Sequence, residues 1–166
     1  MKHLSLFSIV FILLCSCQSK DNIIDEPEVN TNDINLKEYD SIKAAKYGAD
    51  DYGMKTYVMA FLKRGSNDSI QPEEASKLQN EHLKNIMKMA EEGKLVLAGP
   101  FMDNGELRGI YIFNVETIQE AEELTNTDPS IQAGVLAMEL KQWYGSAALM
   151  AVNDIHNTLS KQAIAE

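Results

Sequence analysis

Hydrophobic and polar residues follow two different periods along the central part of the chain. Thr56–Leu62 (TYVMAFL) is apolar on both faces, rich in β-branched and aromatic residues, and followed by a Lys-Arg-Gly-Ser-Asn turn, so it predicts a strand. From Pro72 to about Glu92 the apolar residues recur at helical spacing instead, and their stripe consists of Ala75, Leu78, His82, Ile86 and Met89. This pattern predicts a helix that directs His82 towards the sheet.

Turn residues mark the next two strands. Gly99-Pro100 ends a second predicted strand, Leu95–Ala98, because proline cannot donate a hydrogen bond to a central ladder. Asn104-Gly105 predicts a hairpin that leads into a third strand, Leu107–Phe113.

A second helix and a fourth strand complete the pattern. Thr117 and Glu120 form a capping box, which opens a helix that runs to about Thr125. Val135–Leu140, with Trp143 beyond it, predicts the fourth strand. The order β-α-β-β-α-β is that of a ferredoxin-like α+β fold, in which an antiparallel sheet carries both helices on one face.

Two shorter helices are expected at the ends of this domain. Asp40 caps the first, Ser41–Tyr47, and Gly48 closes it in a left-handed conformation. Ser146–Ser160 predicts the second, and its apolar face consists of Leu149, Val152, Ile155 and Leu159. We therefore expect an ordered domain over residues 39–160, with its core in residues 54–149.

The N-terminus predicts export. Residues 1–17 begin with a positive charge at Lys2, continue with an apolar run too short to span a bilayer, and end at Cys17 after the small residue Ser16. This segment resembles a bacterial lipoprotein signal with a lipobox, in which Cys17 is acylated; the alternative is an ordinary cleaved signal peptide. Residues 18–38 are polar, acidic and free of aromatic residues, which predicts a disordered spacer. We therefore expect a lipid-anchored protein of the cell envelope, whose domain faces the periplasm or the exterior.

Composition excludes several classes of function. The formal net charge of −10 argues against nucleic acid, because a nucleic-acid binder needs a basic surface. Both cysteines lie in the signal segment, so the domain has no disulfide framework or cysteine metal site. The sequence contains no phosphate loop, dinucleotide fingerprint or zinc spacing, and we expect neither a metal nor a cofactor.

Several spaced motifs together resemble the YCII-related domain family, from about Gly48 to Leu149. They are His82-Leu83, Gly93-Lys94-Leu95, Ala98-Gly99-Pro100, Gly109, Glu120-Ala121, Asp128-Pro129, Ala133-Gly134 and Trp143. The approach Gly48-Ala49-Asp50 to the first strand and the closing Trp143-Tyr144-Gly145-Ser146 resemble one branch of this family. The chain departs from the family at Lys141-Gln142, where relatives often carry proline, and this puts the end of the fourth strand in doubt.

The resemblance implies a dimeric α/β barrel made of two ferredoxin-like sheets. It also implies an active site formed by a His–Asp pair, which is here His82 and Asp128. One relative is a dehydrochlorinase that acts on a chlorinated hydroxyhydroquinone, structural cousins include muconolactone isomerases, and most members have no assigned reaction.

Each candidate site residue has a structural alternative. A histidine in an apolar stripe is often a core residue, and an aspartate before proline is often a helix cap. In this topology, however, the middle of the first long helix and the turn after the second one can meet at one end of the sheet. Asp128 would then fix the tautomer of His82 and raise its basicity. Gly99, Pro100 and Phe101 are either turn and core residues or a place where a ligand approaches the backbone.

Two functions remain open at this point. The first is a cofactor-free enzyme, of lyase, isomerase or dehalogenase type, in which His82 moves a proton on a small cyclic or phenolic molecule. The second is a non-catalytic module that binds a small ligand or only builds a dimer. We expect a homodimer in either case, because strands that are apolar on both faces need cover on both faces.

Overall fold

A computed structural model describes residues 38–162 and 164 of the chain. The predicted signal segment, Cys17 and nearly all of the predicted spacer lie outside these residues. The elements, in chain order, are α1 (Ser41–Tyr47), β1 (Met54–Arg64), α2 (Pro72–Glu91), β2 (Leu95–Pro100), β3 (Leu107–Phe113), α3 (Ile118–Thr125), α4 (Pro129–Gln132), β4 (Leu136–Ser146), the 3-10 helix η2 (Ala147–Ala151) and α5 (Val152–Leu159).

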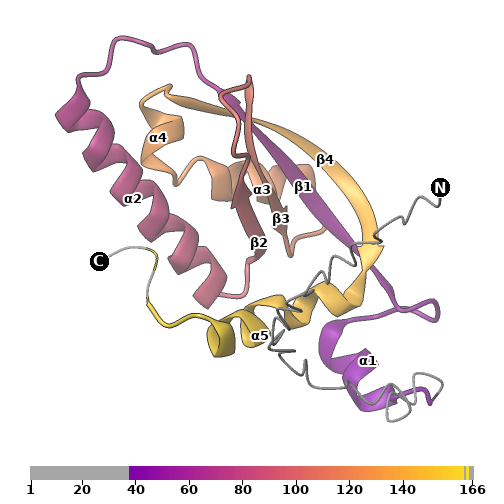
Figure 1. The fold of residues 1–166 in the computed structure, drawn as a ribbon. Helices are drawn as coiled ribbons and strands as arrows, with labels where there is room; N and C mark the ends of the chain where they lie inside the picture. The colour runs from indigo at the N-terminus through magenta and orange to yellow at the C-terminus, as the bar shows by residue number, and fades with distance from the viewer. Residues whose placement is uncertain (1–37, 163, 165–166) are drawn as a thin grey trace, which may run out of the picture. The chain divides into compact units, whose positions relative to one another are not determined.

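The four strands form one antiparallel sheet in the order β2-β3-β1-β4 (Figure 1). Strand β1 lies in the interior of the sheet and pairs with β3 on one side and β4 on the other. The chain thus forms an α+β domain whose strand order is consistent with a ferredoxin-like fold. This confirms the expected α+β class with an antiparallel sheet, whereas the barrel made of two such sheets stays a prediction.

One face of the sheet is covered by α2 and α3. Val58, Ala60 and Leu62 of β1 alternate onto this face, where they join Tyr111 and Phe113 of β3 in a buried cluster. The helices contribute Met89 and Ala121 to the same cluster, with Ile86, Ile118 and Leu124 packed against it. Burial of this apolar area is the main force that holds the helices on the sheet.

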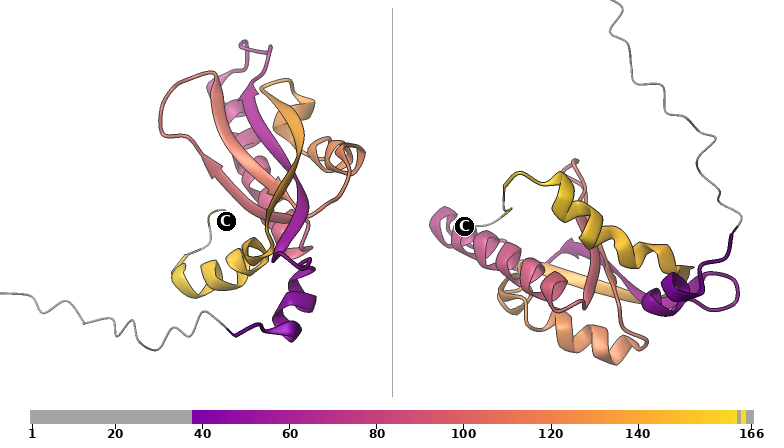
Figure 2. Two further views of the ribbon diagram at one scale, coloured as in Figure 1. Left: turned by 90° about the vertical axis from the view of Figure 1, so that its right-hand side faces the viewer. Right: turned by 90° about the horizontal axis from the view of Figure 1, so that it is seen from below.

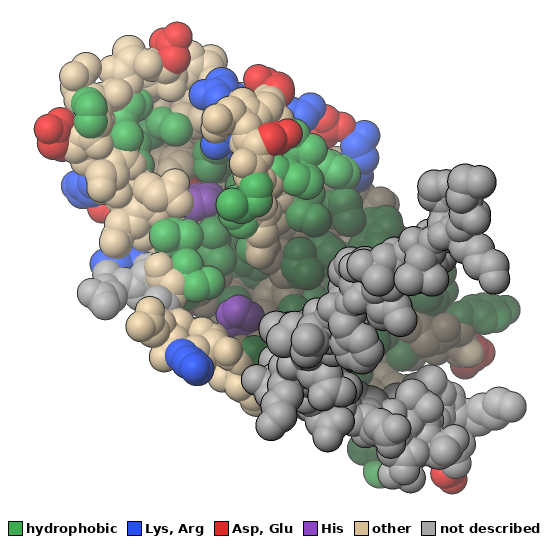
Figure 3. All heavy atoms as spheres, viewed as in Figure 1, with side chains coloured by type: hydrophobic (Ala, Val, Ile, Leu, Met, Phe, Trp, Pro, Cys, Tyr) green, Lys and Arg blue, Asp and Glu red, His purple; other side chains and the backbone are tan. Residues whose placement is uncertain are grey.

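The opposite face carries a second, smaller cluster of Tyr57, Val96 and Ile112. Leu149 and Met150 of η2 pack against it, and Figure 2 shows that α3 and α5 lie on opposite sides of the sheet. The remaining apolar side chains of this face are half-buried, and they include Met59, Phe61, Leu97, Ile110 and Trp143. Figure 3 shows hydrophobic side chains gathered over the sheet. The C-terminal segment therefore covers part of a face that we expected to need a second subunit.

Strand β4 differs from its prediction in two ways. It continues without interruption through Lys141-Gln142 to Ser146, so the departure from the family pattern does not end the strand. It is also not apolar on both faces, because Glu139 forms ion pairs with Lys63 and Lys141 on the face opposite the helices. The two lysines lower the pKa of Glu139 to about 2.

Strand β2 is longer than predicted. Gly99 and Pro100 pair with Ile110 and Gly109 of β3 instead of ending the strand. The reason is that β2 is an edge strand, where a proline that cannot donate a hydrogen bond is tolerated.

The helix ends follow their capping residues. Asp40 accepts a hydrogen bond from the backbone N–H of Lys43, and Gly48 closes α1 at φ 67°. Thr117 and Glu120 form the predicted capping box of α3. The predicted C-terminal helix instead divides into η2 and α5, and Ile155 and Leu159 of its apolar face are exposed.

The motif before β1 and the motif at the end of β4 have a structural role. Asp50 accepts hydrogen bonds from the backbone N–H groups of Tyr52 and Met54, and its second oxygen accepts one from the hydroxyl of Tyr144. The Tyr144 hydroxyl and the two backbone donors hold the pKa of Asp50 below its ordinary value. The pair thereby ties the turn before β1 to the end of β4.

Candidate functional site

His82 and Asp128 come together where α2 packs against α4. His82 lies in the middle of α2, on the stripe that faces the sheet, and Asp128 is the N-cap of the short helix α4. Both residues are buried, with exposed fractions of 7% for His82 and 0% for Asp128. The expected meeting of the helix with the turn after α3 is therefore present.

Nδ1 of His82 lies 2.6 Å from Oδ2 of Asp128. The other carboxylate oxygen, Oδ1, accepts a hydrogen bond of 2.8 Å from the backbone N–H of Ser130. Asp128 is thus a helix cap and the partner of a histidine at the same time, so the two interpretations of this residue do not exclude each other. An ionised carboxylate can only accept hydrogen bonds, which places the proton on Nδ1 and leaves Nε2 as the basic nitrogen.

Tyr111 is a third member of the site. Its hydroxyl oxygen lies 3.2 Å from Nε2 of His82, its side chain is only 2% exposed, and its ring stacks near the imidazole. Burial, and then the negative charge of Asp128, raise the pKa of Tyr111 above its ordinary value. Tyr111 is therefore a neutral hydroxyl that donates to Nε2, and the three residues form one hydrogen-bonded row.

The sequence analysis did not single out Tyr111. The signal that could have found it is the alternation of β3, because Tyr111 and Phe113 share the face that carries the helices. A polar hydroxyl on a strand residue that faces a buried histidine needs a partner, and the histidine provides it.

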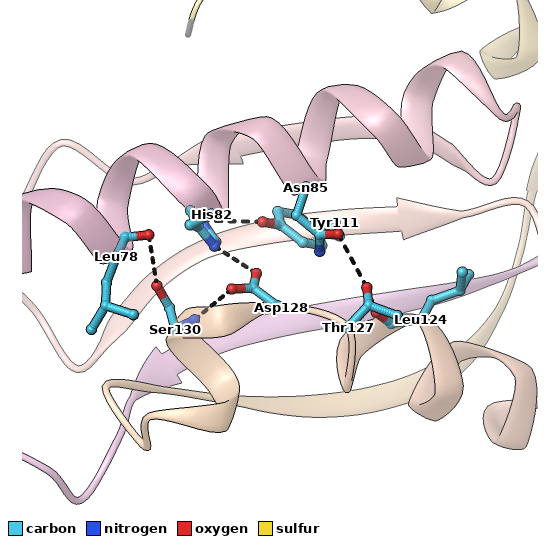
Figure 4. A network of polar contacts seen from close by, with 8 residues as sticks. All are labelled: Leu78, His82, Asn85, Tyr111, Leu124, Thr127, Asp128 and Ser130. Atoms are coloured by element: carbon cyan, nitrogen blue, oxygen red, sulfur yellow. Dashed lines mark hydrogen bonds and ion pairs between the residues drawn. The ribbon is translucent and has the colours of Figure 1, made fainter. Parts of the chain in front are cut away.

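A second contact between the same two segments lies beside the His–Asp pair. The hydroxyl of Thr127 lies 3.2 Å from Oδ1 of Asn85, one turn along α2 from His82 (Figure 4). The hydroxyl of Ser130 donates to the carbonyl of Leu78 on the other side of His82, at 3.4 Å. Three neighbouring positions of α2 are thus joined to residues 127–130.

The C-terminal end of β2 consists of Gly99 and Pro100, and Phe101 follows it. Gly99 and Pro100 take part in the sheet, and Phe101 is 43% exposed. A Cβ atom added at Gly99 would meet no atom within 4 Å, so the backbone is open to close approach there. These residues make no hydrogen bond to the His–Asp pair, and their role in ligand binding stays a prediction.

Two surface hollows lie away from the pair. One of about 490 Å³ follows β2 between α2 and α5, and one of about 420 Å³ lies beside Asp50 and Tyr144. Neither is lined by His82 or Asp128.

The family model of the YCII-related domain matches residues 56–144, which is more than half of the chain. The chain belongs to the YCII-related domain family. The matched residues run from β1 to β4 and include His82, Tyr111 and Asp128.

One solved structure similar to this YCII-related domain is 5-chloro-2-hydroxyhydroquinone dehydrochlorinase from Burkholderia phenoliruptrix AC1100, in complex with 2,5-dihydroxybenzoquinone. The two sequences are 18% identical, the match covers 52% of this chain and 92% of that chain, and the TM-score is 0.39. None of the curated proteins compared with the chain matches it.

Groups of metal ligands and membrane-spanning helices are both absent from the described part of the chain. Among residues 38–162 and 164, no three His, Cys, Asp or Glu side chains are grouped as metal ligands would be. In the same part of the chain, no helix combines the length and the apolar character needed to cross a bilayer.

Proposed function

We propose that this protein is a cofactor-free enzyme in which His82 and Asp128 perform acid/base chemistry on a small cyclic or phenolic molecule. The observation that carries the proposal is the buried contact of 2.6 Å between Nδ1 of His82 and Oδ2 of Asp128. A buried carboxylate that engages one ring nitrogen orients the imidazole and stabilises its protonated form. The relevant reaction is a proton transfer of the lyase, isomerase or dehalogenase type.

The row of three residues supports a definite path for the proton. The hydroxyl of Tyr111 gives its proton to Nε2 of His82 and takes a proton from the substrate, so that Tyr111 stays neutral and His82 becomes an imidazolium. Asp128 balances the new positive charge. The electron pair left on the substrate either expels a leaving group or is protonated at a different carbon when His82 returns the proton.

A non-catalytic module is the second candidate, and one observation favours it. Both nitrogens of His82 already have partners, and all three members of the row are buried. A polar network of the protein interior that only fixes the packing of α2 on α4 has the same features. In that case the domain would bind a small ligand elsewhere or serve only as a dimer.

We also propose the context in which the domain works. The lipobox-like sequence around Cys17 supports a lipid anchor in a bacterial envelope, with the domain facing the periplasm or the exterior. The half-buried apolar side chains on the face of the sheet opposite the helices support a homodimer.

Metabolite capture on the immobilised protein tests the proposed function. The full chain and its His82→Gln variant are exposed to the same bacterial extract, and the retained small molecules are compared and then incubated with each protein. An enzyme that depends on His82 enriches and converts a compound that the variant does not convert. Equal capture with no conversion by either protein would favour the module.

A further inference from the structure

The row of His82, Asp128 and Tyr111 is closed to solvent. All three residues are buried, and none of them lines either of the two surface hollows. A bound molecule can therefore exchange a proton with His82 only if some part of the domain that covers the row moves aside. The row is covered by α2 on one side and by the segment between α3 and β4 on the other (Figure 4).

Apolar packing holds α2 on the sheet. Met89 of α2 is buried in one cluster with Val58 of β1 and Phe113 of β3, and Ile86 packs against the same cluster. Moving α2 off the sheet would expose this apolar area to water, which is the most costly change that a domain of this kind can undergo locally. Helix α2 and the sheet are therefore the fixed part of the site.

Residues 126–132, which we call the flap, are held in a different way. The buried side chains of the flap are Asp128 and Ser130, and both are polar. Its apolar side chains, Pro129 and Ile131, are half-buried and belong to neither hydrophobic cluster. The flap therefore loses little apolar contact when it leaves α2, which is the property of a segment that opens easily.

Three polar contacts join the flap to α2 (Figure 4). They are the carboxylate of Asp128 on Nδ1 of His82 at 2.6 Å, the hydroxyl of Thr127 on the amide of Asn85 at 3.2 Å, and the hydroxyl of Ser130 on the carbonyl of Leu78 at 3.4 Å. Water can take the place of a polar partner when the flap lifts, so contacts of this kind add little net stability. They fix the position of the closed flap and still allow it to open.

Both ends of the flap are anchored. Beyond its C-terminal end, the carbonyls of Ala133 and Gly134 accept hydrogen bonds from the side-chain amide and the backbone N–H of Asn67, at 2.9 and 3.0 Å. A Cβ atom at Gly65 would lie 2.0 Å from the Gly134 carbonyl oxygen, so the two backbones touch there. Before the flap, α3 is anchored by Ala121 in the core. The flap thus pivots between the end of α3 and Gly134, whose φ of 72° suits glycine.

We propose that the flap lifts away from α2 to admit the ligand to His82 and Tyr111 and then closes over it. This inference rests on the proposed function. Because the flap carries Asp128, opening separates the His–Asp pair, and closing restores it. The pair is therefore complete only when the ligand is enclosed and shielded from bulk water.

A disulfide that locks the flap tests the proposal. The full chain carries Cys15→Ser and Cys17→Ser, so that Asn85→Cys and Thr127→Cys supply its only thiols. The probe is diethyl pyrocarbonate, which acylates imidazoles, and mass spectrometry of peptides follows the reaction at His82 and at the exposed His156. In the reduced protein His82 should react slowly but to completion. Oxidation should slow this reaction by about tenfold or more, because His82 then becomes accessible only through wider unfolding, and should leave His156 unchanged.

A matched disulfide shows whether the effect belongs to the flap. Lys46→Cys and Asp154→Cys join α1 to α5, where the native side chains lie 3.5 Å apart, and this disulfide should leave the reaction at His82 unchanged. A second measurement needs no disulfide. In the unmodified full chain, nuclear magnetic resonance should show the ring N–H of His82 exchanging with water more readily than the backbone N–H of the buried Met89, which reports the unfolding of α2.

The outcomes separate the flap from the proposed function. Equal reaction rates at His82 in the oxidised and reduced proteins, or equal protection of the two protons from exchange, would overturn the flap and leave the proposed function to the metabolite test. A flap that opens and is locked by the disulfide, in a protein that converts no captured compound, would support the flap and overturn the proposed function.

Discussion

The hydroxyl of Tyr111 occupies the one nitrogen of His82 that Asp128 leaves free. Nε2 lies 3.2 Å from the Tyr111 oxygen, while Nδ1 lies 2.6 Å from the carboxylate of Asp128. Neither contact alone separates a catalytic histidine from a structural one. In the proposed reaction, a substrate proton would therefore reach His82 through the hydroxyl of Tyr111, or after that hydroxyl has moved aside.

The turnover and the melting temperature of His82→Gln together distinguish a catalytic His82 from a structural one. Glutamine can still donate a hydrogen bond to Asp128 but cannot take up a proton, so we expect turnover to be lost while the melting temperature changes little. His82→Ala is the control for packing, since a cavity at this buried position should cost on the order of 2 kcal/mol or more. If His82→Gln keeps both binding and turnover, His82 is a core residue.

Asp128→Asn should abolish most of the activity without unfolding α4. Asparagine is as good an N-cap as aspartate, so the hydrogen bond from Ser130 is kept. The amide cannot stabilise an imidazolium as a carboxylate does. In the proposed reaction His82 and Asp128 act as a unit, so the double variant with His82→Gln should be scarcely less active than either single variant. Additive losses in a comparison of turnover rates would show that the two residues act independently.

Tyr111→Phe should reduce turnover and lower stability. The substitution leaves the buried Nε2 of His82 without a partner, at a cost on the order of 1 to 3 kcal/mol. Because the pKa of Tyr111 is raised in the folded protein, its contribution to stability is fully present below about pH 10, the ordinary value, and is lost as the pH rises above it. Denaturant unfolding from pH 8 to pH 11 should therefore show a steeper loss of stability in the wild type than in Tyr111→Phe. Parallel curves would mean that folding does not raise the pKa of Tyr111.

The sequence predicted the elements well because their signals are local. The stripe of α2, the capping box of Thr117 and Glu120, and the closing glycine of α1 each act within a few residues. The pairing of His82 with Asp128 was implied by the resemblance to the YCII-related family, and the predicted topology allowed the two segments to meet. The predicted ends of β2 and β4 were wrong because the end of a strand depends on the strands beside it. Pro100 is tolerated within β2 only because β2 lies at the edge of the sheet.

Tyr111 and the flap could not be found in the same way. A tyrosine in a strand and a serine in a turn are ordinary residues in sequence, and they become informative only through their partners. Tyr111 is notable because its hydroxyl meets a buried imidazole, and Ser130 of the flap because its hydroxyl reaches the Leu78 carbonyl on α2. Both facts depend on distances between segments more than twenty residues apart in the chain.

Cys17→Ser tests the predicted anchor. An acidic protein with a net charge of −10 does not adhere to anionic lipid by itself, so a covalent lipid on Cys17 is the expected tether. We expect the wild-type protein in the membrane fraction and the variant in the soluble fraction of the producing bacterium. Cys15→Ser is the matched control and should remain with the membrane. Recovery of Cys17→Ser in the same membrane fraction as the wild type would rule out lipidation at this residue.

The proposed homodimer would use the sheet face opposite α2 and α3. Leu149 and Met150 of the C-terminal segment pack against part of this face, whereas Phe61 and Ile110, which pair across β1 and β3, remain half-buried. A second subunit is the simplest cover for these two side chains. Protein lacking residues 1–35 should therefore sediment as a dimer at micromolar concentration.

A charge on this face should break the dimer without unfolding the domain. Phe61→Lys places an ammonium group beside the existing ion pair of Lys63 and Glu139, where a monomer can keep it in water but a dimer has to bury it. We expect the variant to sediment as a monomer with an unchanged far-ultraviolet circular dichroism spectrum. Lys55→Glu, on the same strand but outside this cluster, is the control and should remain dimeric. A wild-type protein that sediments as a monomer on dilution to the same concentration would mean that η2 and α5 suffice as cover, and that the barrel expected from the family does not form.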